Sequence, residues 1–364
     1  MALSKIQGLQ TITTNDNIIV NGAMLVDQRN QTVTNGDQAT GDNKYLADRF
    51  ENIFQDGDST TRIDTSSVSI GDHPEEFTKA AKVVCSAVDD LSDATSVYYN
   101  IRYNSIEQRD LRRFNFGTSS AKKLVLSFWV KSGVTGTFFI TFQQDNGTNF
   151  IRYHSPYTIS SANTWEKKTV IMTAPGTGLN WVQNHTSDGG MRVMFHLACS
   201  SDRLDSTINT WFEDTTNSQQ IRCGTGQTNF FLTADAEFYL TGVKLEEGSV
   251  VTPFQHESYS DVLRKCQRYY NRLGYMKHQF YSSSANSSNP DLVDTITFPP
   301  MRAAPAANPY TDANYSSSGS GGTSSTTLTL ADIGISSLSS SAQRSSTGAA
   351  NVRTTYYLEL NAEI

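Results

Sequence analysis

The sequence has few of the residues from which reactive centres are built. Its 364 residues include only four cysteines and six histidines, and neither group is clustered. It has no Cys-x-x-Cys pair and no histidine at metal-ligand spacing, so it predicts neither a zinc site nor a disulfide framework, and we expect buried free thiols. The motifs of metalloproteases, serine hydrolases and phosphate-binding loops are missing as well. We therefore expect no enzyme, no metal and no cofactor.

Long runs of one kind of residue are also missing. Lysine and arginine are scattered singly and the formal net charge is -7, which gives no basic surface for nucleic acid. Nowhere do about 18 apolar residues run together, so we expect no membrane insertion. The start, Met1 to Lys5, lacks the pattern of a secretory signal, which predicts folding in a cytoplasm.

What the sequence does contain favours β-structure. Aromatic residues make up 10% of the chain, glycine numbers 24, and asparagine, serine and threonine are abundant. This composition is typical of short strands joined by polar turns. A length of 364 residues is comfortable for two hydrophobic cores. We therefore expect an all-β protein of two domains.

Alternating apolar residues mark the strands and assign their faces. The stretch from Lys123 to Val130 is almost continuously apolar and predicts a central strand buried on both faces. Tyr239 is expected to share one face with Val243 and Leu245. The three clearest inward sets are Val97, Tyr99, Ile101 and Tyr103; Phe138, Ile140 and Phe142; and Met191, Val193, Phe195 and Leu197.

The pattern divides the chain into three parts. Residues 1–17 are expected to form a polar N-terminal arm, 18–257 a β-sandwich, and 258–364 a short helix and a small C-terminal β domain. Ser260 is predicted to cap the helix, with Val262, Cys266, Tyr269 and Leu273 at helical spacing. Residues 316–325 predict a flexible loop. The last strand should place Val352, Thr354, Tyr356, Leu358 and Leu360 on one face.

Several short motifs in order resemble the tail-fibre or virion structural proteins of tailed bacteriophages. The opening Asn21–Arg29 is similar to that family's Asn-Gly-x-Met signature, although Phe50 stands where the family usually has tryptophan. The middle of the chain resembles the family's sandwich, itself similar to carbohydrate-binding jelly rolls. The motifs are Asn21–Arg29, Tyr45–Phe50, Glu107–Arg109, Leu126–Ser132, Thr135–Thr137, Phe238–Gly248, Thr252–Phe254, Cys266–Tyr270 and Phe298–Pro305, within roughly residues 18 to 310.

This resemblance implies a jelly-roll-like sandwich in a virion subunit that is assembled in the bacterial host cytoplasm. We expect a homotrimeric tail-fibre or appendage subunit that contacts the host surface and reaches other virion proteins through its arm. The alternative is a capsid-surface decorating or cementing subunit with no receptor role. A polysaccharide-degrading tailspike is a remote alternative, because neighbouring carboxylates such as Glu75 and Glu76 would point to opposite sides of a strand.

The four tryptophans are the candidate sugar-stacking residues. Trp129 lies in the apolar stretch and Trp165 begins a strand, so we expect both in core or edge packing. Trp181 and Trp211 lie in longer polar connections, where a large aromatic ring needs a neighbouring subunit or a ligand to cover it. Trp181 and Trp211 are therefore the candidate contacts for a host surface glycan.

Overall fold

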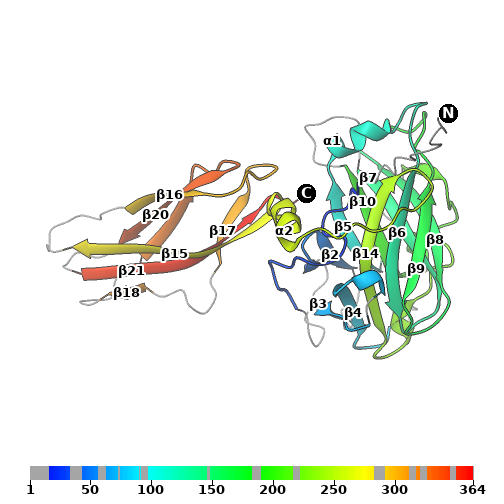
Figure 1. Cartoon of the computed structure of the whole chain (residues 1–364), viewed down its shortest axis with the longest axis horizontal. Helices are drawn as coiled ribbons and strands as arrows, with labels where there is room; N and C mark the ends of the chain where they lie inside the picture. The colour runs from blue at the N-terminus through cyan, green and yellow to red at the C-terminus, as the bar shows by residue number, and fades with distance from the viewer. Residues whose placement is uncertain are drawn as a thin grey trace, which may run out of the picture.

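The computed structural model is the predicted fold class, a jelly-roll-like β-sandwich followed by a short helix and a small C-terminal β domain. Figure 1 shows the sandwich and the C-terminal β module side by side along the long axis, with the helix between them. The structure describes residues 16–32, 43–55, 63–72, 74–89, 91, 97–145, 148–182, 190–215, 222–282, 292–310, 317–319, 326–344 and 350–363.

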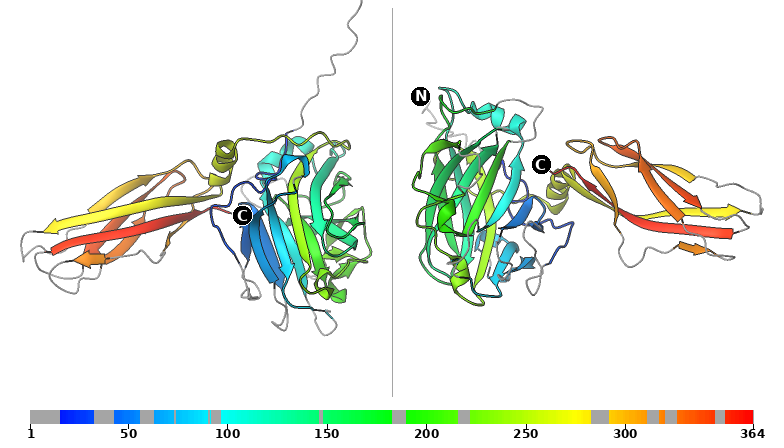
Figure 2. Two further views of the ribbon diagram at one scale, coloured as in Figure 1. Left: turned by 60° about the horizontal axis from the view of Figure 1, so that its bottom comes forward. Right: turned by 180° about the vertical axis from the view of Figure 1, so that it is seen from behind.

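Two antiparallel sheets form the sandwich. The larger has the order β1 (Lys44–Ala47), β2 (Phe50–Gln55), β5 (Tyr98–Ile106), β10 (Met191–Cys199), β7 (Gly136–Asp145), β8 (Phe150–Ile159) and β12 (Trp211–Asp214). The smaller has the order β3 (Ile63–Ser69), β4 (Lys79–Cys85), β14 (Glu237–Glu247), β6 (Leu124–Ser132) and β9 (Glu166–Met172). Both views of Figure 2 show the two layers packed face to face.

Short elements connect these strands. They are the parallel pair β11 (Leu204–Asp205) and β13 (Cys223–Gly224), the helix α1 (Gln108–Leu111) and the 3-10 turns Pro74–Glu76, Arg112–Phe114, Ser201–Arg203 and Phe230–Leu232.

The sandwich core forms where the inner faces of the two sheets meet. All residues of the three predicted inward sets are buried there, and they belong to one continuous apolar cluster. The alternation of apolar residues, which places every second side chain on the same face, therefore assigned these strands correctly. Apolar burial of this extent is the main source of stability for the unit.

Strand β6 differs from its prediction. Val125 and Ser127 are buried on the outer face of the sheet, so the first half of the strand is buried on both sides. Further along, Trp129 and Lys131 are only half-buried on that outer face. Trp129, which was predicted in core or edge packing, lies outside the sandwich core and packs half-buried against a second cluster around Phe77. Its odd-numbered position points it away from the inner face that Phe128 and Val130 share.

A bulge in β14 reverses which residues face inward. The pairing of β14 with β6 shifts between Thr241 and Lys244, and Gly242 has a φ of 62°. Before the bulge Leu240 faces the core and Tyr239 the outside, whereas after it Val243 faces the core. Tyr239 therefore does not share a face with Val243 and Leu245 as predicted, since the extra residue changes the alternation.

Gly242 should tolerate no side chain. A Cβ atom built there would lie 2.7 Å from the ring of Phe77, and the backbone is in the left-handed region. We expect Gly242→Ala to lower the free energy of unfolding by about 1 to 3 kcal/mol, measured by urea denaturation. Gly176→Ala is the control, because nothing lies within 4 Å of its Cβ position. Equal stability of the two variants would contradict the role assigned to the bulge.

The outer face of the larger sheet is polar and buried. Arg152 and His154 on β8, Thr141 on β7 and His196 on β10 are all 0% exposed. Strand β13 contacts β7 and β8 on this face, and the backbone carbonyl of Arg222 beside it accepts a hydrogen bond from Thr141 Oγ1. The segment around β13 thus covers a layer of polar side chains.

The C-terminal module has its own core. One sheet joins β15 (Tyr270–Ser282), β21 (Ala350–Asn361) and β17 (Ala306–Tyr310), with β18 (Ser317–Gly319) also paired to β21; the other has the order β16 (Leu292–Thr297), β20 (Ser337–Arg344) and β19 (Thr326–Ala331). Of the predicted last-strand set, Leu358 and Leu360 are buried in this core. The side chains of Val352, Thr354 and Tyr356 lie outside the described residues.

Helix α2 (Tyr259–Gln267) is shorter than predicted and begins two residues earlier. Its cap is Ser258, whose Oγ accepts a hydrogen bond from Asp261 N, so the assignment of the cap to Ser260 is wrong. Val262 and Cys266 pack against Val26 of the N-terminal segment. Leu273, which was placed at helical spacing, lies in β15, because the chain turns into that strand at Tyr270.

The chain after β14 folds back over the sheet. Strand β14 ends at Glu247, before Pro253. Lys244 Nζ, which is buried, donates hydrogen bonds to Thr252 Oγ1 and to the carbonyl of Pro253. This connection therefore covers one half of the outer face of the smaller sheet and leaves the other half open.

Two predicted segments fall mainly outside the described residues. Of the predicted arm, residues 1–17, only Asp16 and Asn17 are described. The side chain of Asn17 is hydrogen-bonded to the backbone of Val243 and Leu245 in β14. Of the predicted flexible loop, residues 316–325, only the three residues of β18 are described.

Candidate functional site

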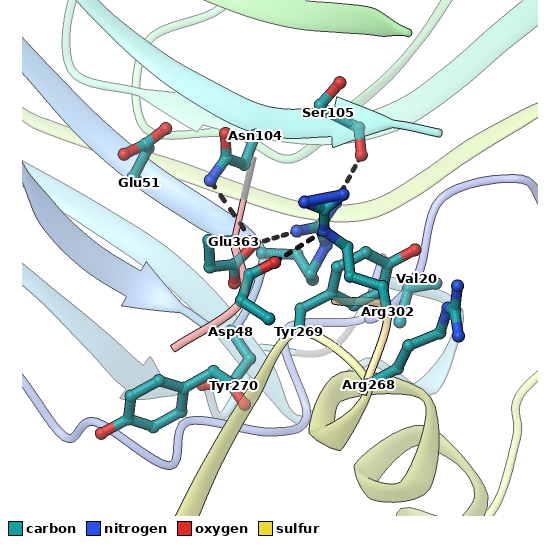
Figure 3. A network of polar contacts seen from close by, with 12 residues as sticks. Val20, Asp48, Glu51, Asn104, Ser105, Arg268, Tyr269, Tyr270, Arg302 and Glu363 are labelled. Carbon is teal, nitrogen blue, oxygen red and sulfur yellow. Dashed lines mark hydrogen bonds and ion pairs between the residues drawn. The ribbon is translucent and has the colours of Figure 1, made fainter. Parts of the chain in front are cut away.

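A buried ion pair joins the end of the chain to the sandwich. Glu363 lies just beyond β21, and its carboxylate pairs with Arg49, which follows β1 and is 0% exposed. A second amino group of Arg49 donates to the backbone carbonyl of Ser105, and Asn104 Nδ2 lies 3.4 Å from the same carboxylate. Figure 3 shows these groups converging between the two units.

Aromatic rings and a second arginine complete this junction. The guanidinium of Arg29 lies between the rings of Tyr45 and Tyr270, 3.6 Å from each centroid. It is also 3.7 Å from Asp48 and 3.5 Å from Glu363. Because Tyr45 belongs to β1 and Tyr270 begins β15, Arg29 is held by both units at once.

A carboxylate of the sandwich anchors the segment after α2. Glu107 accepts hydrogen bonds from Arg268 Nε at 3.0 Å and from the hydroxyl of Tyr269 at 2.8 Å. The ring of Tyr269 in turn lies 3.6 Å from the guanidinium of Arg49. The junction, which we define as Arg29, Asp48, Arg49, Glu107, Tyr269 and Glu363, is therefore one connected network. Figure 3 shows Asp48, Tyr269 and Glu363 within it.

Burial changes the protonation of this network. It raises the pKa of Asp48 to about 6, although Arg29 and Gln28 oppose the change. Burial would lower the pKa of Arg49, but attraction to Glu363 outweighs it and holds the pKa above its usual value. Because unpaired buried charges are costly, the network favours one relative placement of the two units. The junction therefore helps to set how the C-terminal module projects from the sandwich.

The open half of the smaller sheet carries alternating rings and lysines. On neighbouring strands Lys82 lies beside Tyr239, and Tyr239 beside Lys131. In the next row Trp129 lies beside Lys167. The Nζ of Lys131 is 4.7 Å from the ring centroid of Tyr239 and 5.3 Å from that of Trp165. We call these six residues, Lys82, Trp129, Lys131, Trp165, Lys167 and Tyr239, the cation–aromatic face.

Each lysine of the cation–aromatic face has an acidic partner. Lys82 pairs with Glu237 at 2.5 Å, Lys131 with Asp72 at 2.7 Å and Lys167 with Glu75 at 2.8 Å. The hydrogen bond from Lys131 lowers the pKa of Asp72 below its usual value. The face is therefore nearly neutral, and rich in donors and acceptors between its rings.

A cavity of about 520 Å³ adjoins this face. Lys167 and Glu75 line it together with Thr252, Phe254 and His256. The rings of Phe254 and His256 lie 5.2 Å apart. Rings beside hydroxyl, amine and carboxylate groups are the chemistry that binds a sugar, because the rings cover its C–H face and the polar groups satisfy its hydroxyls.

The structure buries both predicted glycan contacts. Trp181 is 7% exposed and Trp211 9%, and their rings meet edge to face at 5.5 Å. Trp211 Nε1 donates to the carbonyl of Thr173, and Trp181 packs on Phe116. The chain's own core therefore supplies most of the cover that we expected from a subunit or a glycan. Trp181 also lines a small cavity beside α1.

Sequence reasoning missed the cation–aromatic face. Trp129 and Lys131 stand two positions apart in β6, as Ser127 and Trp129 do, and polar residues at this spacing indicate an outer face. The continuous run of apolar residues in this strand instead predicted burial on both faces. Tyr239 could not have been placed, because its face depends on the bulge at Gly242.

Other site types find no support in the described part of the chain. All four cysteines are buried free thiols. No group of three or more histidine, cysteine, aspartate or glutamate side chains among the described residues could hold a metal ion. Within those residues, no helix has the length and hydropathy needed to cross a bilayer.

Comparisons with known proteins give only weak similarities. No protein-family model and no curated protein sequence matches the chain. A sugar-binding protein assigned in Bacteroides thetaiotaomicron is 12% identical over 64% of this chain and 100% of its own, with a TM-score of 0.31. The enzymatically active domain of tailspike protein 4 of bacteriophage CBA120 is 11% identical over 64% of this chain and 21% of its own, with a TM-score of 0.30.

A family 11 carbohydrate-binding module of a Clostridium thermocellum cellulase is 15% identical over 59% of this chain and 100% of its own, with a TM-score of 0.28. At TM-scores this low, none of these matches carries an argument about function. The fold class rests on the strands and sheets of the chain itself.

Proposed function

We propose that the chain is a structural subunit of a tailed-bacteriophage particle, a trimeric tail-fibre or appendage component that contacts a glycan-bearing host surface. The proposal includes no catalytic step. It places the chain in the virion, with the N-terminal arm reaching other virion proteins. The resemblance of the sequence motifs supports the virion role, and the cation–aromatic face supports the contact with a glycan.

One observation carries the contact. Three rings, Trp129, Trp165 and Tyr239, remain partly exposed on the outer face of the smaller sheet. Their partner groups belong to neighbouring strands, so the sheet holds rings and polar groups at fixed spacing. A rigid platform of this kind loses little conformational entropy when a sugar chain binds across it.

The contact predicts loss of binding from single substitutions on the face. We expect the isolated chain to bind members of an array of bacterial surface glycans, and Tyr239→Ala to weaken that binding about tenfold, because a stacked ring contributes roughly 1 kcal/mol or more. Tyr259→Ala is the matched control, since Tyr259 is a 54% exposed ring on α2, away from the face. An array with no bound glycan, or equal loss in both variants, would contradict the contact.

The virion role has its own test. In a purified phage particle that contains the chain, quantitative mass spectrometry should find few copies, and the free chain should compete with the particle for adsorption to its host. Hundreds of copies per particle without competition would indicate a capsid-surface decorating or cementing subunit instead.

A further inference from the structure

A cavity of about 340 Å³ lies where the N-terminal segment, the connection after β14 and helix α2 meet. Part of its lining is apolar and accessible, because Val20, Ala23, Leu25 and Phe254 are all only half-buried. A volume of this size falls within the range of pockets that receive a ligand or a few side chains of a partner. The cavity therefore offers apolar surface that a group from outside the described residues can cover.

The rim of this cavity carries negative charge. Asp16 and Glu76 are both exposed there, and neither has an ion pair with a described residue. A third carboxylate, Glu257, is paired with Lys265. Glu76 also has a φ of 66°, a strained conformation for a residue other than glycine, and such strain is concentrated at binding sites. An occupant with apolar side chains and a positive charge would match both the lining and the rim.

The N-terminal arm starts at the same place. The backbone N–H of Ile18 donates to the carbonyl of Leu245 at 2.9 Å, which fixes the chain against β14 just after Asp16. Residues 1–15 thus continue from the rim of the cavity, and fully extended they would span about 50 Å. Thr13 and Thr14 favour extended backbone, whereas filling the cavity of the same chain would require an immediate reversal there. The arm is therefore better suited to reach a neighbouring subunit.

The composition of the arm matches the cavity. Residues 1–15 contain one lysine, Lys5, and no acidic residue. Leu3 and Ile6 stand on either side of Lys5, so aliphatic and positive groups occur together within four residues. Opposite charges on two surfaces guide their association and fix its register.

We propose that the cavity receives the N-terminal arm of a second copy of this chain. Leu3 and Ile6 cover the apolar lining, and Lys5 pairs with Glu76 at the rim. The backbone of an extended segment also supplies hydrogen-bonding groups, as in other cases where one subunit binds an arm of the next. The inference rests on the proposed trimeric subunit and deepens it, because it names a second copy as the virion protein that the arm contacts.

The test uses two differently tagged forms of the full chain that are co-expressed, one with Ser4→Cys and the other with Gln255→Cys at the exposed rim. The four native cysteines are buried, so a short bismaleimide should link only the introduced thiols. We expect position 4 of one chain to be linked to position 255 of the other, at least about tenfold more than in a control pair, because docking raises the local concentration of the two thiols. The control pairs Ser4→Cys with Thr233→Cys, an exposed position before β14 that does not line the cavity.

A charge exchange tests the rim. Glu76→Lys in the acceptor chain should lower the linked yield about threefold or more, and Lys5→Glu in the donor chain should then restore it. Equal yields at positions 255 and 233 would overturn the inference, and so would an unchanged yield in Glu76→Lys. Linkage within single chains that carry both Ser4→Cys and Gln255→Cys, with none between chains, would mean that the arm fills its own cavity, which also overturns it.

Light scattering on the same samples separates this inference from the proposed function. Trimers without linkage between chains would overturn the docking of the arm alone. Monomers would overturn both the docking and the trimer. Neither result would affect the cation–aromatic face, whose failure shows separately as retained array binding in Tyr239→Ala.

Discussion

Replacing Arg49 by methionine should lower the free energy of unfolding by about 3 to 5 kcal/mol, because the buried carboxylate of Glu363 then loses its closest cation and keeps only the more distant Arg29, at 3.5 Å. Methionine keeps much of the length of the arginine side chain, so the cavity left behind is small. The change would also remove the hydrogen bond to the carbonyl of Ser105. Urea denaturation of the purified chain measures the effect.

Two further variants separate the charge from the packing. Arg264→Met removes an exposed ion pair on α2, in which the side chains are 74% and 52% exposed, and should change stability by about 0.5 kcal/mol or less. Adding Glu363→Gln to Arg49→Met should restore part of the loss, since the buried carboxylate that lost its closest cation is then gone. If Arg49→Met is no more destabilising than Arg264→Met, the junction does not hold the two units.

The same substitution should alter the shape of the molecule in solution. Because Arg49 and Glu363 lie 314 residues apart and belong to different units, their pair helps fix the angle between sandwich and module. We expect small-angle scattering of the variant to show a broader range of overall dimensions. In the proposed fibre subunit this angle would set the direction in which the module points, so stability and assembly would change together.

Local patterns in the sequence account for most of the fold. Alternation placed Phe138, Ile140 and Phe142 inward because burial at every second position is a property of each strand alone. It failed at Tyr239, since a bulge depends on how two strands pair and not on one strand's composition. The helix cap was misplaced by two residues because Ser258 and Ser260 are equally suited by type.

The sites could be predicted far less well. Trp181 was identified as an aromatic residue in a polar connection, but its burial comes from Phe116 and Trp211, which lie far away in sequence. The junction joins residues near both ends of the described chain, and no local signal marks Arg29 or Glu363 as partners. Long-range contacts of this kind follow from the fold and cannot be inferred from the pattern that produces it.

Mild acid should destabilise the sandwich through two buried histidines. Thr141 Oγ1 donates its proton to the carbonyl of Arg222, so it can only accept from His154 Nδ1 at 2.7 Å and from His196 Nε2 at 2.9 Å. Each ring therefore carries its proton on that side and is neutral. The opposite nitrogens are buried and have no partner among the described residues, so a second proton would find no acceptor.

The sign of the effect follows from the direction of the pKa shifts. Burial and the nearby charge of Arg152 lower the pKa of His154 to about 3, and burial lowers the pKa of His196 well below its usual 6.5. Below pH 6.5 these two histidines bind protons in the unfolded chain but not in the folded chain. Stability is therefore lost as pH falls, approaching about 1.4 kcal/mol per pH unit for each histidine.

Asp48 acts in the opposite direction, so variants are needed to isolate the histidines. Its pKa of about 6 lies above the unfolded value, and the folded chain gains stability from it as pH falls below 6. The amide of His154→Gln can still donate a hydrogen bond to Thr141. Between pH 6.5 and 5 we expect the unfolding free energy of this variant to fall less steeply with decreasing pH than that of the unchanged chain, by at most about 1.4 kcal/mol per pH unit. His256→Gln, an exposed histidine, should leave the slope as it is. A slope that is the same in all three proteins would mean that His154 is charged in the folded chain, and that the polar layer under β13 is open to water.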